Sequence, residues 1–208
     1  MTEFAAFQTL SPTILADVLN RDQVMDIGIR PLWEGMPRIA GPAFTVRCGP
    51  GDNLMLHAAI YRAPPGTIIV VESADNNYAV AGGNVCAVAQ KRGIVGFVID
   101  GVIRDLAEAR ENRFPVFARG VVPIPGGKDV IDILNDRPVR CGGVQVSPGD
   151  TVIADEEGIV VVPSSRQAQV LKSAQERALK DAATGLEAWE ATHRKRIEEI
   201  LRAKGFAG

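Results

Sequence analysis

The stretch from Gly82 to Asp105 constrains the fold of this chain more than any other part, and it reads GGNVCAVAQKRGIVGFVIDGVIRD. After two glycines, small apolar residues follow a helical pattern that ends near Gly93. Residues 94–99 are too apolar for an exposed strand and too few for a typical helix, so we predict a buried strand. Asp100 and Gly101 are then expected to turn the chain. Across the sequence, strands alternate with helices early and cluster late, which predicts a mixed α/β sandwich.

Three chemical features of this stretch are expected to meet at the end of the predicted strand. A helix that opens on Gly82 and Gly83 presents free N–H groups, which suit a carboxylate or a phosphate. Arg104 is a planar cation for a carboxylate or enolate oxygen, and Asp105 is a hard oxygen ligand for a divalent cation. The structural alternative is that Asp105 and Glu108 form a helix N-cap with its capping box, while the glycines form a turn and Arg104 is solvated.

The sequence resembles the family that contains the regulator of ribonuclease activity A and the 4-hydroxy-4-methyl-2-oxoglutarate/4-carboxy-4-hydroxy-2-oxoadipate aldolases. The resemblance lies in the order Gly-Gly, helix, RGIVGFVIDG, two residues and Arg-Asp. Four further segments match the family and occur in its order along the chain, one before this stretch and three after it: GDNLMLHAA from Gly51, FPVFARG from Phe114, VSPGD from Val146 and ADEEGIVVVP from Ala154. The resemblance therefore covers nearly the whole chain. It implies a swivelling β/β/α fold, assembled as homotrimers or hexamers with active sites in clefts between subunits.

The resemblance also implies a divalent-metal-dependent lyase, an aldolase or decarboxylase that releases pyruvate from a 2-oxo acid through an enolate. In this reading Asp105 anchors Mg²⁺ or Mn²⁺, and Arg104 binds the substrate and stabilises the enolate oxygen. The substrate carboxylate would be held by the backbone N–H groups of Gly82, Gly83, Asn84 and Val85. Asp17 and Asp181 correspond to acids that the aldolases supply from a neighbouring subunit, and Asp17 would reach the metal through water.

One position departs from the aldolase pattern. The aldolases have an aspartate after the first glycine of the cradle, which works with water in proton transfer at the substrate hydroxyl, whereas this chain has Gly83. Retro-aldol cleavage must remove that proton, but decarboxylation of a diacid such as oxaloacetate needs no such base. The sequence therefore predicts a shifted substrate or a base recruited from elsewhere, with the acids of the 72–76 loop as candidates.

The alternative function is a non-catalytic protein that binds and inhibits ribonuclease E, as the family's founding regulator does. Adjacent Arg104 and Asp105 favour an enzyme, because a protein-binding surface needs no metal ligand beside an enolate-stabilising cation. We expect His57 to be a packed or interface histidine rather than a catalytic one. Arg119 and Lys128 are expected to be solvated surface charges, although either could draw in an anionic substrate.

Composition restricts the other function classes. A net charge of −2 gives no basic footprint for nucleic acid. No apolar run approaches transmembrane length and the N-terminus lacks a signal-peptide pattern, so we expect a cytoplasmic protein without a membrane partner. Three widely spaced cysteines predict neither a disulfide framework nor a zinc site, only buried small apolar residues. With His57 and His193 as its 2 histidines, the chain favours an oxygen-ligand site over a histidine-rich metal centre.

The chain is expected to fold as a single α/β domain over residues 1–163, followed by a helical extension over 164–208. The extension is charged and is interrupted at Gly185, and it is predicted to pack on the domain or on a neighbouring subunit because such helices cannot bury themselves alone. Within the domain, we predict helices over 10–20 and 52–62. Short antiparallel strands are expected between residues 139 and 162.

Overall fold

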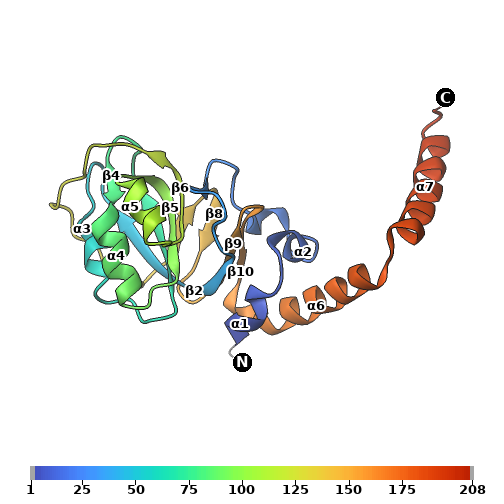
Figure 1. Cartoon of the computed structure of the whole chain (residues 1–208), viewed down its shortest axis with the longest axis horizontal. Helices are drawn as coiled ribbons and strands as arrows, with labels where there is room; N and C mark the ends of the chain where they lie inside the picture. Colours follow the sequence, from blue (N-terminus) through green and yellow to red (C-terminus); the bar gives the residue numbers. More distant parts are fainter. Residues whose placement is uncertain (1–2, 207–208) are drawn as a thin grey trace.

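The computed structural model describes residues 3–206, and it has the predicted mixed α/β fold with a helical C-terminal tail (Figure 1). The strands of its 8-stranded sheet are β1 (Arg30–Pro31), β2 (Ile39–Cys48), β3 (Ile68–Ser73), β4 (Ala79–Ala81), β5 (Gly96–Ile103), β6 (Val116–Val121), β9 (Thr151–Asp155) and β10 (Gly158–Val162). Their order is β1-β6-β5-β3-β2-β9-β10, and β4 also pairs with β5. A 2-stranded sheet consists of β7 (Val139–Cys141) and β8 (Val144–Val146).

The central strands are parallel and buried. β3 pairs with β2 and β5, and β5 pairs with β6, all in parallel. Phe97, Val98 and Ile99 of β5 are fully buried, as strands covered on both faces require. The predicted buried strand is thus confirmed. The predicted turn at Asp100 and Gly101 is wrong, because β5 continues to Ile103 through a register irregularity against β6.

The helices are α1 (Glu3–Gln8), α2 (Pro12–Ala16), α3 (Leu54–Ala59), α4 (Gly83–Lys91), α5 (Leu106–Glu111), α6 (Gln167–Ala183) and α7 (Leu186–Ala203). α3, α4 and α5 cover one face of the sheet, where Leu56 and Cys86 join a core cluster with strand residues such as Ile99. The β7–β8 hairpin packs on the opposite face, and its Val139 and Val146 belong to a second cluster. The chain therefore forms two β layers and one helical layer.

The end of the sheet is covered by the N-terminal helices and the start of α6. Phe7, Leu15, Val170 and Ala174 are buried together against β9 and β10. The antiparallel pairing of β7 with β8 and of β9 with β10 confirms the predicted late strands. The two predicted helices are shorter than expected, since only the ranges of α2 and α3 are helical.

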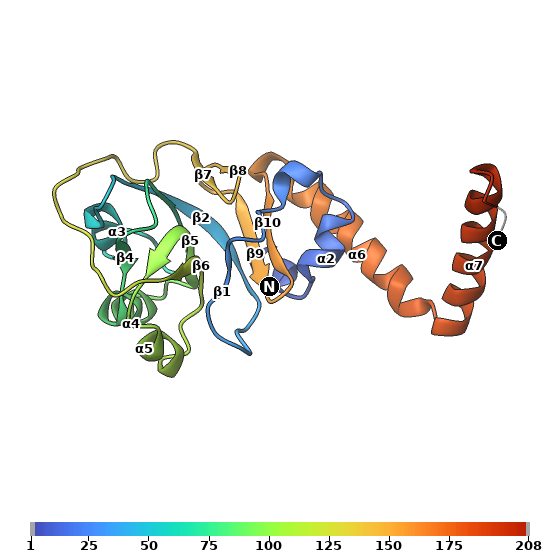
Figure 2. The same ribbon diagram turned by 90° about the horizontal axis from the view of Figure 1, so that it is seen from above.

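The C-terminal tail extends away from the sheet (Figures 1 and 2). α6 ends at Ala183 and α7 begins at Leu186, so the break expected at Gly185 is confirmed. No residue of α7 is buried within the described part of the chain. Packing of the tail on a neighbouring subunit stays a prediction. Residues 1–2 and 207–208, the outer ends of the two predicted regions, lie outside the described residues.

The cysteines are buried and free, as the composition predicted. Burial raises the pKa of the Cys48 and Cys86 thiols to about 12, so neither is a nucleophile at neutral pH. Among residues 3–206, no helix is both long and apolar enough to cross a lipid bilayer.

Candidate active site

The glycine cradle forms where β4 passes into α4. Gly82 is the N-cap residue of α4 in an extended conformation, and no side chain caps the helix there. The first N–H groups of a helix have no partner within it, so they are available to an anion. A Cβ atom on Gly82 would lie 2.6 Å from Oδ2 of Asp105 and 3.1 Å from Cγ of Arg104. The position therefore needs glycine because two functional side chains approach the backbone.

Arg104 and Asp105 follow directly after β5. The backbone N–H of Arg104 donates to the carbonyl oxygen of Ala81 at 2.9 Å, which holds the end of β5 beside the cradle. Nε of Arg104 lies 3.3 Å from Oδ2 of Asp105. The same oxygen accepts a hydrogen bond from the backbone N–H of Gly83 at 3.3 Å. Cradle, cation and carboxylate thus meet at one strand end, as predicted.

Asp105 does not cap α5 with its side chain. It occupies the N-cap position with a left-handed backbone (φ 56°), and its carboxylate makes no hydrogen bond to the helix. A non-glycine residue in this region costs of order 1 kcal/mol, and such residues concentrate at functional sites. The capping alternative is therefore wrong for this side chain, which instead points toward the start of α4.

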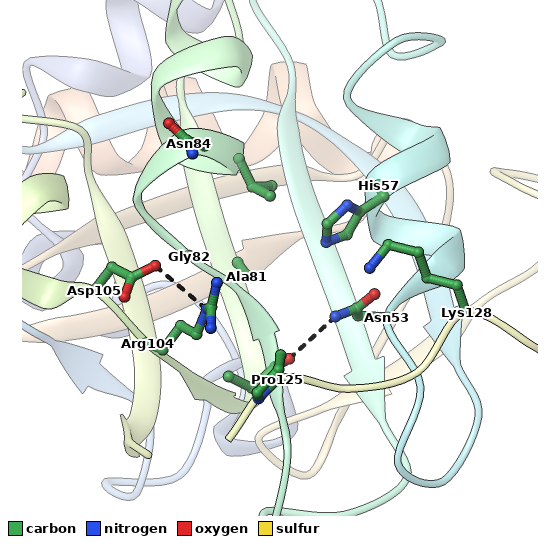
Figure 3. A pocket seen from close by; sticks show the side chains of 11 residues that line it. Asn53, His57, Ala81, Gly82, Asn84, Arg104, Asp105, Pro125 and Lys128 are labelled. Atoms are coloured by element: carbon green, nitrogen blue, oxygen red, sulfur yellow. Dashed lines mark hydrogen bonds and ion pairs between the residues drawn. The ribbon is translucent and has the colours of Figure 1, made fainter. Parts of the chain in front are cut away.

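These groups line one wall of a cavity of about 210 Å³ (Figure 3). The cavity residues on this wall are Ala81, Gly82, Asn84, Val85, Arg104 and Asp105. The opposite wall carries Asn53 and His57, with Lys128 from the loop after β6, and Pro125 of the same loop lies between the two walls. Asn84 and Val85, which we expected to bind the substrate, line this cavity, and their role in binding stays a prediction. Lys128, which we expected to be a surface charge that could draw in an anionic substrate, also lines it.

Asn53 brings a buried acceptor to this cavity. The residue is 3% exposed, and its Nδ2 donates to the carbonyl oxygens of Ala79 at 3.4 Å and Gly126 at 3.2 Å. Its Oδ1 is buried without a hydrogen-bond partner in the described part of the chain. Buried polar atoms are nearly always paired, so this oxygen calls for a donor. Figure 3 shows it on the side of His57 and Lys128.

His57 is half-buried on α3, with its ring toward the cavity. Burial lowers the pKa of its imidazole, and the positive charges of Lys128 and Arg104 lower it further, while Asp52 opposes them. The ring is therefore neutral at physiological pH. We expected a packed or interface histidine, and the structure adds that the residue lines the cavity. Its distance of four residues from Asn53, which favours one helix face, was the available signal.

Lys128 reaches the cavity because Asp52 anchors its loop. The Asp52 carboxylate is buried and accepts hydrogen bonds from the backbone N–H groups of Leu54 at 2.8 Å, Asp129 at 2.5 Å and Val130 at 3.2 Å. Burial raises the pKa of this carboxyl, but the three donors outweigh burial and hold it below its ordinary value. Asp52 thereby fixes the entrance to α3 and the 128–130 segment together.

Glu108 occupies the space next to Gly83. A Cβ atom on Gly83 would lie 2.6 Å from Cδ and 2.7 Å from Cβ of Glu108. The Glu108 side chain is exposed and is not among the described residues that line the cavity. A carboxylate therefore lies beside the position where the aldolases carry their aspartate, although Glu108 is not among the described cavity residues.

Asp17 and Asp181 lie elsewhere in the chain, at α2 and α6. Both carboxylates pair with Arg177, at 3.0 Å from its Nε for Asp17 and 2.7 Å from its Nη1 for Asp181. Within one chain, these helices lie across the molecule from α4 and α5 (Figure 1). Their expected role is across a subunit boundary, so it stays a prediction.

The acids of the 72–76 loop are engaged in structural contacts. Glu72 pairs with Arg47 at 3.3 Å, and Asp75 accepts backbone hydrogen bonds from Gly51 and Asn77. Neither is among the described cavity residues, so the structure gives no support to a base from this loop. Arg119 is not a solvated charge, because it pairs with Asp100 and Asp26 away from the cavity.

Comparison with known proteins decides the family. Residues 12–161 match the RraA-like family, described as Aldolase/RraA. The chain belongs to the RraA-like family. A member from Halalkalibacterium halodurans, named "Putative 4-hydroxy-4-methyl-2-oxoglutarate aldolase", is 37% identical over 178 residues, or 85% of this chain and 84% of that protein. The resemblance read from the sequence is thus confirmed.

Solved structures related to RraA share the fold. Streptomyces coelicolor RraAS2, described as an unusual member of the RNase ES inhibitor RraA protein family, matches with a TM-score of 0.75 and 27% identity over 92% of this chain and 95% of its own. The RNA-processing inhibitor RraA from Thermus thermophilis matches with a TM-score of 0.66 and 26% identity over 74% and 92%. These matches agree with the swivelling β/β/α fold that the RraA-like resemblance implied.

Proposed function

We propose that this RraA-like protein is a divalent-metal-dependent carbon–carbon lyase that releases pyruvate from a 4-hydroxy-2-oxo acid or an oxaloacetate-like 2-oxo acid. One observation carries the proposal: Arg104, Asp105 and the start of α4 meet in one cavity. The cavity, at about 210 Å³, is smaller than the roughly 300–1,000 Å³ of drug-sized ligand sites, and it suits a small acid.

The residues present fit Mg²⁺ or Mn²⁺. The side chain of Asp105 is 35% exposed and faces the cavity, and the described residues contain no cluster of three or more histidine, cysteine or acidic ligands. Mg²⁺ commonly keeps several waters and binds through one or two carboxylates plus substrate oxygens, so a single protein carboxylate fits its coordination preference. When bound at Asp105, the ion would supply Lewis-acid polarisation of the 2-oxo group.

The chain's own residues supply orientation and charge stabilisation. The N–H groups at the start of α4, of which that of Gly83 already donates to Asp105 at 3.3 Å, hold the 1-carboxylate of the substrate. The Arg104 guanidinium stabilises the negative charge that grows on the 2-oxo oxygen as the enolate forms. Loss of one preorganised donor to a developing oxyanion costs about 3–4 kcal/mol, which is roughly two to three orders of magnitude in turnover.

The alternative is a regulator that binds ribonuclease E. The structural similarity to RraA proteins favours it to the extent that their descriptions name RNase inhibition. The paired Arg104 and Asp105 at a cavity favour the enzyme, since a surface that docks a protein gains nothing from them. Binding to ribonuclease E with sub-micromolar affinity, without lyase activity, would decide for the regulator.

The lyase is tested by mixing the purified protein with oxaloacetate and Mg²⁺ and following pyruvate with coupled lactate dehydrogenase, after subtraction of the metal-only background. We expect pyruvate release that EDTA abolishes and that Arg104→Ala lowers by roughly two to three orders of magnitude. Arg194→Ala, which changes an exposed arginine of α7, is the matched control. Absence of release from oxaloacetate and from a panel of 4-hydroxy-2-oxo acids would sink the proposal.

We further propose that the chain assembles as a homotrimer or hexamer. The exposed tail supports this, because Leu186 and Trp189 of α7 are 78% and 52% exposed in the single chain. Light scattering coupled to size-exclusion chromatography measures the mass directly. A monomer at micromolar concentration would contradict the assembly.

A further inference from the structure

We propose that His57 is the base that removes the hydroxyl proton during retro-aldol cleavage of a 4-hydroxy-2-oxo acid, and that Asn53 positions its ring. This inference rests on the proposed lyase function and adds the residue that replaces the missing acid at Gly83. It also selects hydroxy acids as the substrate class, because decarboxylation needs no base at that position.

The other candidate bases are excluded by their surroundings. Gly83 has no side chain, and the acids of the 72–76 loop are not among the cavity residues. Glu108 lies beside Gly83 but outside the cavity lining. Asp105 is paired with Arg104 and with the Gly83 N–H. Among the described cavity residues, His57 is then the side chain with a free lone pair and an ordinary pKa near neutrality.

The position of His57 matches the hydroxyl. Arg104 and the α4 N-terminus bind the pyruvoyl end on one wall, and His57 lies on the wall opposite (Figure 3). The hydroxyl oxygen sits on C4, two carbons beyond the 2-oxo carbon, so a substrate that spans the cavity presents it toward the second wall. A general base must reach the proton that it removes, and geometry decides first.

The Asn53 amide is the group proposed to position the ring, although its Oδ1 makes no hydrogen bond in the described part of the chain. A neutral imidazole has one N–H donor and one nitrogen with a free lone pair. The Asn53 Oδ1 is a buried acceptor without a donor, on the same wall and four residues earlier. If it accepts from the ring N–H, the other nitrogen keeps its lone pair for the cavity. A base oriented by a third group is the arrangement that hydrolases also use.

The charges around His57 favour the neutral form of its imidazole, which is the form that can act as a base. Lys128 on the loop after β6 and Arg104 at the end of β5 are both positive and disfavour the imidazolium, whereas Asp52 at the start of α3 favours it. Asp105 also faces the cavity. Burial adds to the two cations, and together they outweigh Asp52.

The proposed step balances. The hydroxyl proton moves to the free ring nitrogen, the C3–C4 bond breaks, and a carbonyl group forms at C4. The electron pair of the broken bond becomes the enolate of pyruvate. The imidazolium then gives its proton to C3 of the enolate, which yields pyruvate and restores the neutral ring. No oxidant or further reactant is needed.

The test compares two reactions of the full-length protein with Mg²⁺: cleavage of 4-hydroxy-4-methyl-2-oxoglutarate and decarboxylation of oxaloacetate. Loss of a general base costs roughly 10²- to 10⁴-fold, so His57→Asn should lower kcat/KM for cleavage by that factor and lower kcat/KM for decarboxylation far less. His57→Gln, with a longer amide, guards against a folding defect in one variant, and thermal unfolding checks both. His193→Asn, at an exposed α7 position, is the matched control.

A second readout does not depend on turnover. The NMR signals of His57, assigned by their loss in His57→Asn, should titrate below the ordinary histidine pKa in the protein alone. An imidazole that stays protonated throughout the pH range in which cleavage proceeds would overturn the proposal.

Each kinetic outcome decides a different point. Equal loss of both reactions, or loss of neither, in the His57 variants overturns the proposal, as does a selective loss in Glu108→Gln instead. Pyruvate from oxaloacetate but from no hydroxy acid overturns the role of His57 and leaves the lyase standing. Pyruvate from neither substrate overturns the lyase and the base together.

Discussion

The carboxylate of Asp105 accepts a hydrogen bond from the backbone N–H of Gly83 at 3.3 Å, across 22 residues of sequence. The anion cradle at the start of α4 is thus partly filled by the protein's own carboxylate. A substrate carboxylate entering there meets negative charge at close range. The proposed divalent cation would offset that charge, so binding of the acid and of the metal should be coupled.

The first prediction follows from this coupling. Oxalate, a stable mimic of the pyruvate enolate, should bind measurably by isothermal titration calorimetry with Mg²⁺ present and should lose most of its affinity in EDTA. Asp105→Ala should abolish binding of Mg²⁺ but permit weak, metal-independent oxalate binding, because the repelling carboxylate is gone. Equal oxalate affinity of the unaltered protein with and without Mg²⁺ would contradict the coupling.

The second prediction concerns the close approach at Gly82. Gly82→Ala places a methyl group 2.6 Å from the Asp105 carboxylate, so the metal ligand must move. We expect a loss in kcat of roughly two orders of magnitude, the cost of misplacing a catalytic group by about 1 Å. Stability should change little by comparison, since the Asp105 side chain is partly exposed.

Gly185→Ala is the matched control for this substitution. Gly185 has an ordinary backbone (φ −68°), and a Cβ atom there meets nothing within 4 Å. It should keep full activity and change stability little, because the gain through the unfolded state is opposed by the loss of glycine at the N-cap of α7. Activity of Gly82→Ala equal to that of the control would show that the approach has no functional role.

One wall of the site was predictable from sequence, because its parts are close together in the chain. Gly82 and Arg104 end two successive parallel strands, β4 and β5, whose carboxyl ends meet at one edge. The resemblance to the aldolases supplied the roles proposed for them. The prediction of a turn at Asp100 and Gly101 was wrong because β5 pairs with strands on both sides, and this pairing overrides the local turn preference.

The second wall was not predictable, because it depends on contacts between distant segments. From the sequence, Lys128 was expected to be a solvated charge. In the structure, Asp52 holds the loop of Lys128 against the start of α3 through a hydrogen bond and a parallel bridge to Gly127. His57 reads as a packed residue because its helix is apolar around it. The cavity that these residues line forms only when distant segments come together in the fold, so no local sequence pattern predicts it.

The third prediction concerns the stability contributed by Asp52. Its folded pKa lies below the ordinary 3.8, so its contribution is complete above that value and is lost as pH falls through the folded pKa. Asp52→Asn removes the charge and should cost about 2–3 kcal/mol at pH 7, with hydrogen bonds to a charged acceptor weakened. Urea unfolding from pH 7 down to pH 3 should show the difference between the two proteins shrinking.

Asp22→Asn serves as the control, because Asp22 is an exposed acid in the short helical turn after α2. It should unfold like the unaltered protein at every pH. A stability difference for Asp52→Asn that stays constant with pH would mean that the carboxylate charge contributes nothing.

The last prediction concerns the pH dependence of the proposed hydroxy-acid cleavage. The pKa of His57 lies below its ordinary 6.5, and a base acts only when it is unprotonated. kcat/KM for cleavage should therefore be flat above that value and fall as pH decreases through the folded pKa. Lys128→Met removes a cation that disfavours the imidazolium, so the pKa rises and the acidic limb should move to higher pH. Lys195→Met, at an exposed position of α7, should leave the limb in place.

Because oxaloacetate decarboxylation needs no base at C4, its pH profile should lack the shift in Lys128→Met. A shift common to both reactions would assign the limb to substrate binding rather than to proton removal by His57.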